Sequence, residues 1–105
     1  MRIPSHHPPP HPGEMLEEEF LKPLGMSQSE LARRLGISFP RVNELIRGKR
    51  GVSPDTALRL ACLFGTTPDV WLSLQLMWDL YHISRSRDAK RIKQEVQPVN
   101  YAKAS

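Results

Sequence analysis

Residues 28–47 read Gln-Ser-Glu-Leu-Ala-Arg-Arg-Leu-Gly-Ile-Ser-Phe-Pro-Arg-Val-Asn-Glu-Leu-Ile-Arg, and this stretch decides the fold. Ser27, followed three positions later by Glu30, is a capping-box pattern that predicts a helix beginning after the serine. Gly36 predicts where that helix ends. Ser38 can cap a second helix, which we expect to continue to about residue 47. The stretch therefore predicts two short helices joined by a tight turn.

A steep crossing of two short helices requires a small residue at the crossing, a glycine in the turn and apolar side chains on the inner face. Ala32 and Gly36 meet the first two requirements. The inner face is supplied by Leu31, Leu35, Ile37, Val42 and Leu45. Because all of these fall at the expected spacing, we interpret the stretch as a DNA-binding helix-turn-helix. A simple helical hairpin is the alternative interpretation.

Stop signals outside this stretch divide the chain into further helices. We expect a helix over residues 14–22, another from Pro54 to Phe64, and a fifth that opens at Thr67-Pro68. No stretch alternates as a strand would, so the predicted fold class is all-α with five helices. The predicted organisation is a flexible Pro/His-rich arm at 1–12, a domain at 13–84 and a basic, partly disordered tail at 85–105, with residues 92–105 fraying.

Composition narrows the class of protein further. A chain of 105 residues supports one domain, and a single cysteine excludes an internal disulfide. No apolar run reaches the ~20 residues that a membrane span needs, and the N-terminus lacks a signal-peptide core. We therefore expect a cytoplasmic protein with no membrane partner. The net charge of +4 arises from basic blocks at 26–50 and 85–105 that outweigh acidic blocks at 1–25 and 51–84.

Catalytic and metal chemistry find little support in the sequence. There is no Ser/His/Asp constellation and no glycine-rich phosphate loop, so we expect no enzyme, cofactor or small-molecule ligand. Cys62 lies among apolar residues of its predicted helix, and we expect a buried, inert thiol. His6, His7 and His11 lack supporting cysteines or carboxylates nearby, which favours a flexible polar arm over a metal site.

Over residues 11–80 the chain resembles the lambda-repressor-like (XRE-type) DNA-binding domain, and within it the HigA-type antitoxins of bacterial toxin–antitoxin modules. The resemblance is carried by residues 28–50 and 53–60, by His11-Pro12-Gly13-Glu14, by residues 18–25, and by residues 65–72 with Leu74-Gln75. It departs from the family in the basic character of residues 82–95, where the family is usually more acidic. The resemblance implies a repressor of its own operon and a small, basic RelE-like ribonuclease toxin as partner.

The second helix of the motif is expected to enter the major groove with its N-terminal residues at base edges. The predicted base-reading residues are Phe39, Pro40, Asn43 and Glu44. Asn43 can read adenine, Glu44 can accept from cytosine, and Phe39 can touch a thymine methyl or pack under the helix start. Predicted phosphate contacts are Ser38, Arg41, Arg47, Lys49 and Arg50, to which the resemblance adds Gln28.

Two protein interfaces complete the prediction. A dimer that binds a palindromic operator would pair through Val70, Leu74, Met77, Trp78 and Tyr81, which carry more apolar area than the small domain needs. The toxin would contact Glu14, Glu17, Glu18, Glu19 and Phe20, an acidic segment with apolar anchors that suits a basic partner. The alternatives are a stand-alone XRE-type repressor without a toxin, and an interaction module that never meets DNA.

Overall fold

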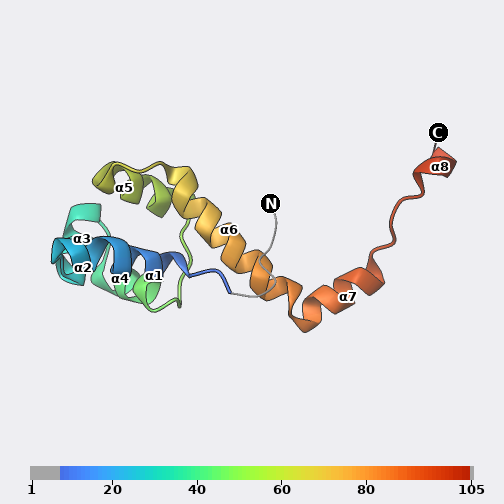
Figure 1. Cartoon of the computed structure of the whole chain (residues 1–105), viewed down its shortest axis with the longest axis horizontal. Coiled ribbons are helices and arrows are strands. Elements are labelled where there is room, and N and C mark those ends of the chain that lie inside the picture. Colours follow the sequence, from blue (N-terminus) through green and yellow to red (C-terminus); the bar gives the residue numbers. More distant parts are fainter. Residues whose placement is uncertain (1–7, 105) are drawn as a thin grey trace.

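The computed structural model describes residues 8–104, and over that range the chain consists of helices and connecting loops (Figure 1). The elements are α1 (Pro12–Leu16), η1 (Glu17–Leu21), α2 (Lys22–Leu24), α3 (Gln28–Leu35), α4 (Phe39–Ile46), α5 (Pro54–Phe64), α6 (Pro68–Ser84), α7 (Arg87–Glu95) and α8 (Tyr101–Ala104). The first three follow one another without a break, with a π-helical turn at η1. In the described range, no helix is long and apolar enough to cross a membrane.

The all-α prediction is confirmed, and the five predicted helices are present. Ser27 and Ser38 cap α3 and α4, as the sequence predicts, with side-chain oxygens that accept the amides of Glu30 and Arg41. The sequence did not predict α7. Residues 87–95, part of the predicted tail, fold as this helix. The predicted fraying at residues 92–105 is therefore wrong for residues 92–95, which belong to α7.

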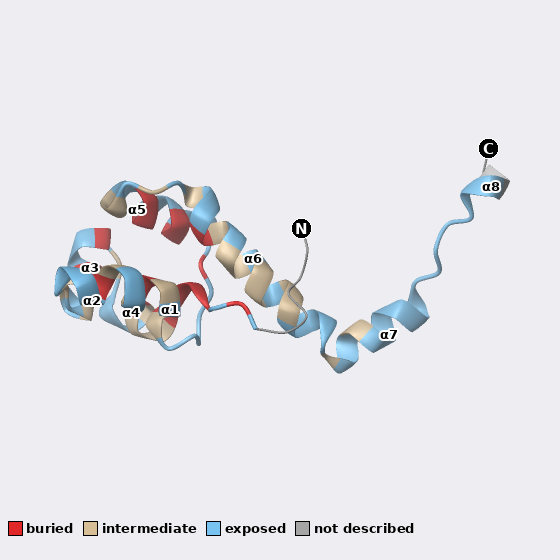
Figure 2. Cartoon of the chain, in the orientation of Figure 1, coloured by how far each residue is buried: buried red, intermediate tan, exposed pale blue. Residues whose placement is uncertain are grey.

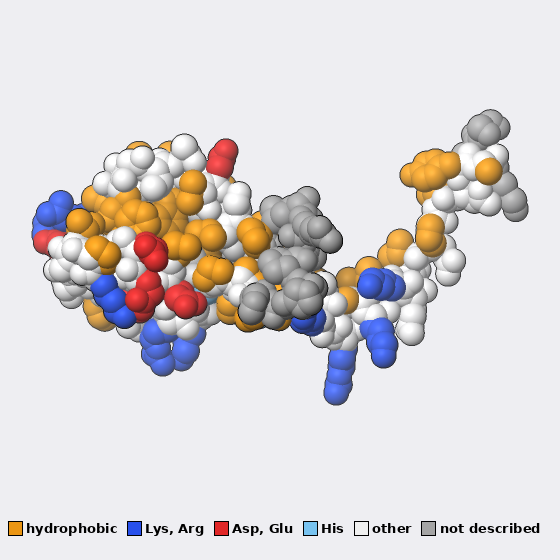
Figure 3. Space-filling view, in the orientation of Figure 1, with side chains coloured by type: hydrophobic (Ala, Val, Ile, Leu, Met, Phe, Trp, Pro, Cys, Tyr) orange, Lys and Arg blue, Asp and Glu red, His pale blue; other side chains and the backbone are white. Residues whose placement is uncertain are grey.

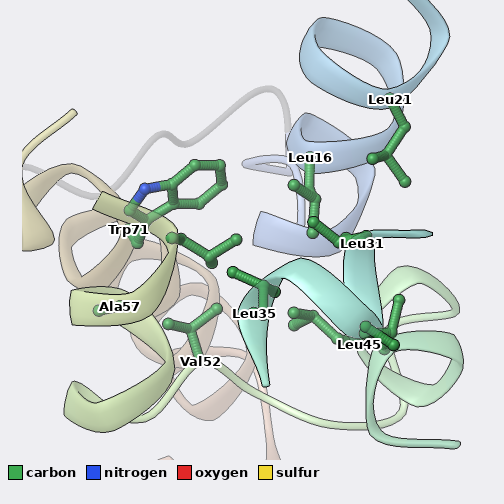
Figure 4. Packing of buried hydrophobic residues seen from close by; sticks show 11 residues of the cluster. Leu16, Leu21, Leu31, Leu35, Leu45, Val52, Ala57 and Trp71 are labelled. Carbon is green, nitrogen blue, oxygen red and sulfur yellow. The ribbon is translucent and has the colours of Figure 1, made fainter. Parts of the chain in front are cut away.

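The core lies where α1, α3, α4, α5 and the start of α6 meet (Figure 4). Leu31, Leu35, Val42 and Leu45, four of the five predicted inner-face residues, are buried, and Ile37 packs against them half-buried. Trp71 is fully buried, and its indole Nε1 donates to Thr66 Oγ1 over 2.8 Å. The steep crossing of α3 and α4 is thus held by a shared apolar face, as expected of this motif.

The last residues of the predicted flexible arm are packed against the domain. His11 is buried and caps α1, because its Nδ1 accepts the Gly13 amide over 2.9 Å. Its ring meets the edge of Trp78 with centroids 5.0 Å apart. Pro9 and Pro12 are also buried. The arm prediction therefore does not hold for residues 9–12, while residues 1–7, with His6 and His7, lie outside the described residues.

Two further features differ from the prediction. Cys62 is exposed on α5 rather than buried, because it lines a surface groove beside Leu58. Helix α6 continues to Ser84 and projects from the domain, so α7 and α8 extend the molecule to 58 × 27 × 24 Å. Figure 2 shows that this extension is almost entirely exposed.

Candidate nucleic-acid interface

The turn between α3 and α4 is fixed by its glycine and by an arginine from α5. Gly36 adopts a left-handed conformation (φ 72°), and its amide donates to Ala32 O over 2.9 Å. Arg59 donates through its terminal guanidinium nitrogen to Leu35 O over 2.8 Å. This bond satisfies a carbonyl at the C-terminal end of α3, which the helix itself leaves unpaired. The sequence prediction missed Arg59, although its place one turn after Asp55 was a visible signal for an ion pair.

The first turn of α4 stands out from the domain. Phe39 is 47% exposed and Pro40 is also exposed. The alternative in which Phe39 packs under the helix start is therefore not what the structure shows. The inner side of the same helix is anchored by buried Val42 and Leu45. This arrangement presents the N-terminal end of α4 to solvent on a fixed base, which is the geometry a groove-reading helix requires.

The two polar residues that follow are each held by a partner from the same predicted interface. Asn43 Nδ2 donates to Gln28 Oε1 over 3.0 Å, which joins α4 to the first residue of α3. The Glu44 carboxylate accepts from Arg50 Nε over 3.2 Å. The structure thus brings two predicted base-reading residues together with two predicted phosphate contacts.

Arg41 is directed toward the N-terminus of α5. Its guanidinium donates to Thr56 Oγ1 over 3.3 Å, and Thr56 lies beside Ser53, the cap of α5. The Arg59 side chain hydrogen-bonds Asp55 over 2.7 Å and so lowers the pKa of that carboxyl, helped by the charge of Arg41. Thr56 is buried and was missed by the sequence prediction, because an isolated threonine after a cap has no distinctive pattern. Arg41 is consequently preoriented at an edge of the helix-turn-helix.

The remaining predicted phosphate contacts surround the exposed turn of α4. Ser38 is exposed at its N-terminal end, with its oxygen accepting the Arg41 amide. Arg47 and Lys49 are exposed at its C-terminal end and in the loop that follows. Cationic and hydroxyl donors at both ends of a groove-reading helix are suited to the phosphates on either side of the groove.

The predicted dimer residues have different surroundings. Val70 is 47% exposed, whereas Leu74 packs against the core. Trp78 lies between two histidine rings, His11 at 5.0 Å and His82 at 4.0 Å. Met77 and Tyr81 are half-buried. Leu76 and Ile83, which the sequence prediction did not include, are 47% and 45% exposed on the same helix.

The predicted toxin-contact segment forms an acidic surface on α1 and η1. Figure 3 shows acidic side chains gathered over these elements. Glu14, Glu18 and Glu19 are exposed, and Glu18 pairs with Lys22 over 2.6 Å. Phe20 instead packs inward, with its ring 4.6 Å from that of Phe64 and 5.4 Å from that of Trp71. The acidic side chains are thus displayed, while the apolar anchor is largely part of the domain.

Comparisons with known proteins agree with this geometry. A family model described as a helix-turn-helix matches residues 18–71. Virulence-associated protein I of Dichelobacter nodosus is 43% identical over 90 residues, which are 86% of this chain and 75% of that protein. Antitoxin HigA-1 of Vibrio cholerae is 39% identical over 84 residues, which are 77% of this chain and 78% of that protein.

Solved structures give the same result. Antitoxin GraA superposes with a TM-score of 0.82 at 44% identity and covers 89% of this chain and 99% of its own. The Pseudomonas aeruginosa antitoxin HigA, solved with the higBA promoter, has a TM-score of 0.80 at 39% identity and covers 88% and 99%. The family consists of DNA-binding regulators and antitoxins, not enzymes. Membership of this family agrees with the prediction, made from the sequence, that the protein is not an enzyme. This chain belongs to the helix-turn-helix family of DNA-binding proteins and, within it, to the HigA-type antitoxins.

Proposed function

We propose that the protein is the antitoxin of a type II module, which represses its own operon as a dimer on a palindromic operator and neutralises a RelE-like, mRNA-cleaving toxin. Both activities would take place in the cytoplasm. The observation that carries the DNA-binding part is the exposed first turn of α4 on a rigid base, with 47% of Phe39 accessible. The Pseudomonas aeruginosa relative solved with its promoter supports the same use of the fold.

In this proposal the exposed side of α4 reads base edges. Phe39 and Pro40 meet a thymine methyl, and Asn43 reads adenine through its amide. Glu44 accepts from cytosine N4 after releasing Arg50. The flanking donors hold phosphates and fix the register without choosing the sequence: Gln28, Ser38, Arg41, Arg47, Lys49 and Arg50.

A mobility shift with the promoter of the protein's own operon tests this assignment. Binding should weaken steeply as salt rises, since phosphate contacts release counterions. The double variant Lys49→Gln/Arg50→Gln should lower the slope of log K against log salt by about 1.8, which is ~0.9 for each lost contact. Binding that is absent, or that does not respond to salt, would favour an interaction module over a DNA-binding protein.

The proposed dimer rests on the apolar character of α6 on more than one side. Val70 and Leu76 are each 47% exposed and Ile83 is 45% exposed, although a helix that is apolar all round is normally buried. Half-sites one DNA turn apart also require a two-fold partner. Val70→Glu should convert the dimer to a monomer in light scattering, and Val99→Glu, the same change at an exposed position in the tail, should not.

Trp78→Glu tests the other end of the same surface. Because Trp78 also packs on His11 within its own chain, circular dichroism must first show that the variant folds. A folded Trp78→Glu or Val70→Glu protein that stays dimeric would contradict this interface.

The toxin-binding part rests on the acidic surface of α1 and η1, which is complementary to a basic toxin. The π-helical turn at Glu17–Leu21 supports it, because such turns occur frequently at functional sites. Charge reversal at Glu17 and Glu19 should weaken toxin binding and spare DNA binding. Charge reversal at Glu95, on α7, is the control. Unchanged toxin affinity would contradict the assignment of this surface.

The second candidate function is a stand-alone repressor of the same fold without a toxin. It is supported by relatives of this chain in Escherichia coli and Haemophilus influenzae that are described as HTH-type transcriptional regulators. Co-expression with the product of the neighbouring gene separates the two functions. Rescue of growth supports the antitoxin, and the absence of any toxic neighbour supports the stand-alone repressor.

A further inference from the structure

Helix α7 carries a basic surface that the helix-turn-helix does not use. Arg87, Lys90 and Lys93 follow one another at three-residue spacing, are all exposed, and line one shallow groove. Within residues 8–104, no ion pair involves any of these three side chains. Arg91, on the next side of the helix, lies between Asp88 at 3.2 Å and Glu95 at 3.6 Å. The positive charge of α7 is therefore concentrated on the side that bears the three unpaired cations.

The turn between α6 and α7 is held by side-chain contacts. Arg85 stacks on the Tyr81 ring at 3.8 Å, and Ser86 caps α7 by accepting the Ala89 amide. These contacts fix the turn after α6, whose 17 residues give a helix about 25 Å long. In Figure 3, basic side chains project from the helix-turn-helix part and from α7 toward the same edge of the molecule.

We propose that α7 binds the sugar-phosphate backbone of operator DNA, at a stretch outside the groove segments that α4 of either protomer enters. This inference rests on the proposed operator binding and names a second contact on the same DNA. Unpaired lysine and arginine side chains gain most from phosphates, because each contact releases condensed counterions.

The opposite side of α7 argues against a lipid surface as the partner. It bears Asp88 and Glu95 beside Ile92, so it offers no broad apolar face to enter a bilayer. A helix that is polar nearly all round is suited to lie along a charged backbone instead. The operator DNA that this chain is proposed to bind supplies such a charged backbone.

The test compares operator binding by the full chain and by its Arg87→Gln/Lys90→Gln/Lys93→Gln variant. The variant should bind about tenfold or more weakly at about 0.1 M salt, with a salt slope reduced by up to ~2.7. In hydroxyl-radical footprinting it should lose backbone protection outside the two half-sites and keep protection at both half-sites, where α4 of each protomer binds. Circular dichroism should show an unchanged fold, since all three side chains are exposed.

Single substitutions provide a control matched in net charge. Lys90→Gln and Lys22→Gln each remove one positive charge, but Lys22 lies on α2 and pairs with Glu18. Only Lys90→Gln should weaken binding. Equal affinity, slope and footprint for the triple variant and the unmodified chain would overturn the inference while leaving operator binding intact. Failure of the unmodified chain to bind its operator would overturn the proposed function, and this inference with it.

Discussion

Asn43 and Gln28 form a hydrogen bond of 3.0 Å that links the outer side of α4 to the first residue of α3. Both side chains are half-buried, so the bond holds the Asn43 amide in one orientation before any DNA arrives. Side chains that are ordered in advance lose less conformational entropy on binding. The pair therefore couples a predicted base-reading residue to a predicted phosphate contact.

This coupling predicts a non-additive double-mutant cycle. Asn43→Ala should cost about 1–3 kcal/mol of discrimination at one base pair, and Gln28→Ala should weaken operator binding. Their interaction energy should be about 1 kcal/mol, measured by titration of operator DNA. Ser29→Ala, at an exposed position beside Gln28, is the control and should not change operator binding. Strict additivity would mean that the hydrogen bond does not position Asn43.

Glu44 holds Arg50 in an ion pair at 3.1 Å, so one acidic group restrains a cation at the DNA face. Glu44→Gln should release Arg50 to contact a phosphate, and it should remove the repulsion between the Glu44 carboxylate and the DNA phosphates. Binding to random DNA should strengthen, with the salt slope steeper by about 0.9. Discrimination at one base pair should fall if Glu44 reads cytosine. Asp69→Asn, an exposed change of equal charge on α6, should leave the slope unaltered.

Gly13 allows α1 to lie directly on the backbone of α4. A Cβ atom there would be 1.8 Å from Leu45 O, so Gly13→Ala must push the helices apart. We expect a loss of about 2–3 kcal/mol in the free energy of unfolding, measured with urea. Gly25→Ala is the control. An alanine is strained at the φ of 61° that Gly25 adopts, but nothing lies within 4 Å of the added atom. It should cost about 1 kcal/mol.

Local signals made much of this fold predictable. Ser27, Gly36 and Ser38 act through bonds to residues three or four positions away, so their pattern alone located α3 and α4. The apolar face of the motif was predictable for the same reason, because helical spacing places Leu31 and Leu35 on one side.

The contacts that the sequence did not predict join distant residues. Arg59 reaches Leu35 O across 24 positions, and Arg41 reaches Thr56 across 15. No local pattern records which side chain will lie near another after folding. The burial of Pro9, Pro12 and His11 at the end of the predicted arm was not predicted for this reason, since proline content indicates an extended segment but not what covers it.

His11 combines two contacts in one buried ring. Its Nδ1 accepts the Gly13 amide, and its ring meets Trp78 edge-on. Burial lowers the pKa of the imidazole below its usual 6.5, although the charges of Asp79 and Glu14 oppose the shift. The neutral form is the one that the fold uses, because a protonated Nδ1 cannot accept the amide.

This environment predicts that stability depends on pH through His11. Because the folded pKa is lowered, its contribution is fully present above pH 6.5 and is lost as the pH falls from there toward the folded value. The free energy of unfolding by urea should drop between about pH 8 and about pH 5.5, and the drop should be smaller for His11→Asn, whose amide oxygen caps α1 without titrating. His82→Asn, a change at an exposed position, should retain the drop. An equal drop in the His11→Asn protein would contradict the assignment of the effect to His11.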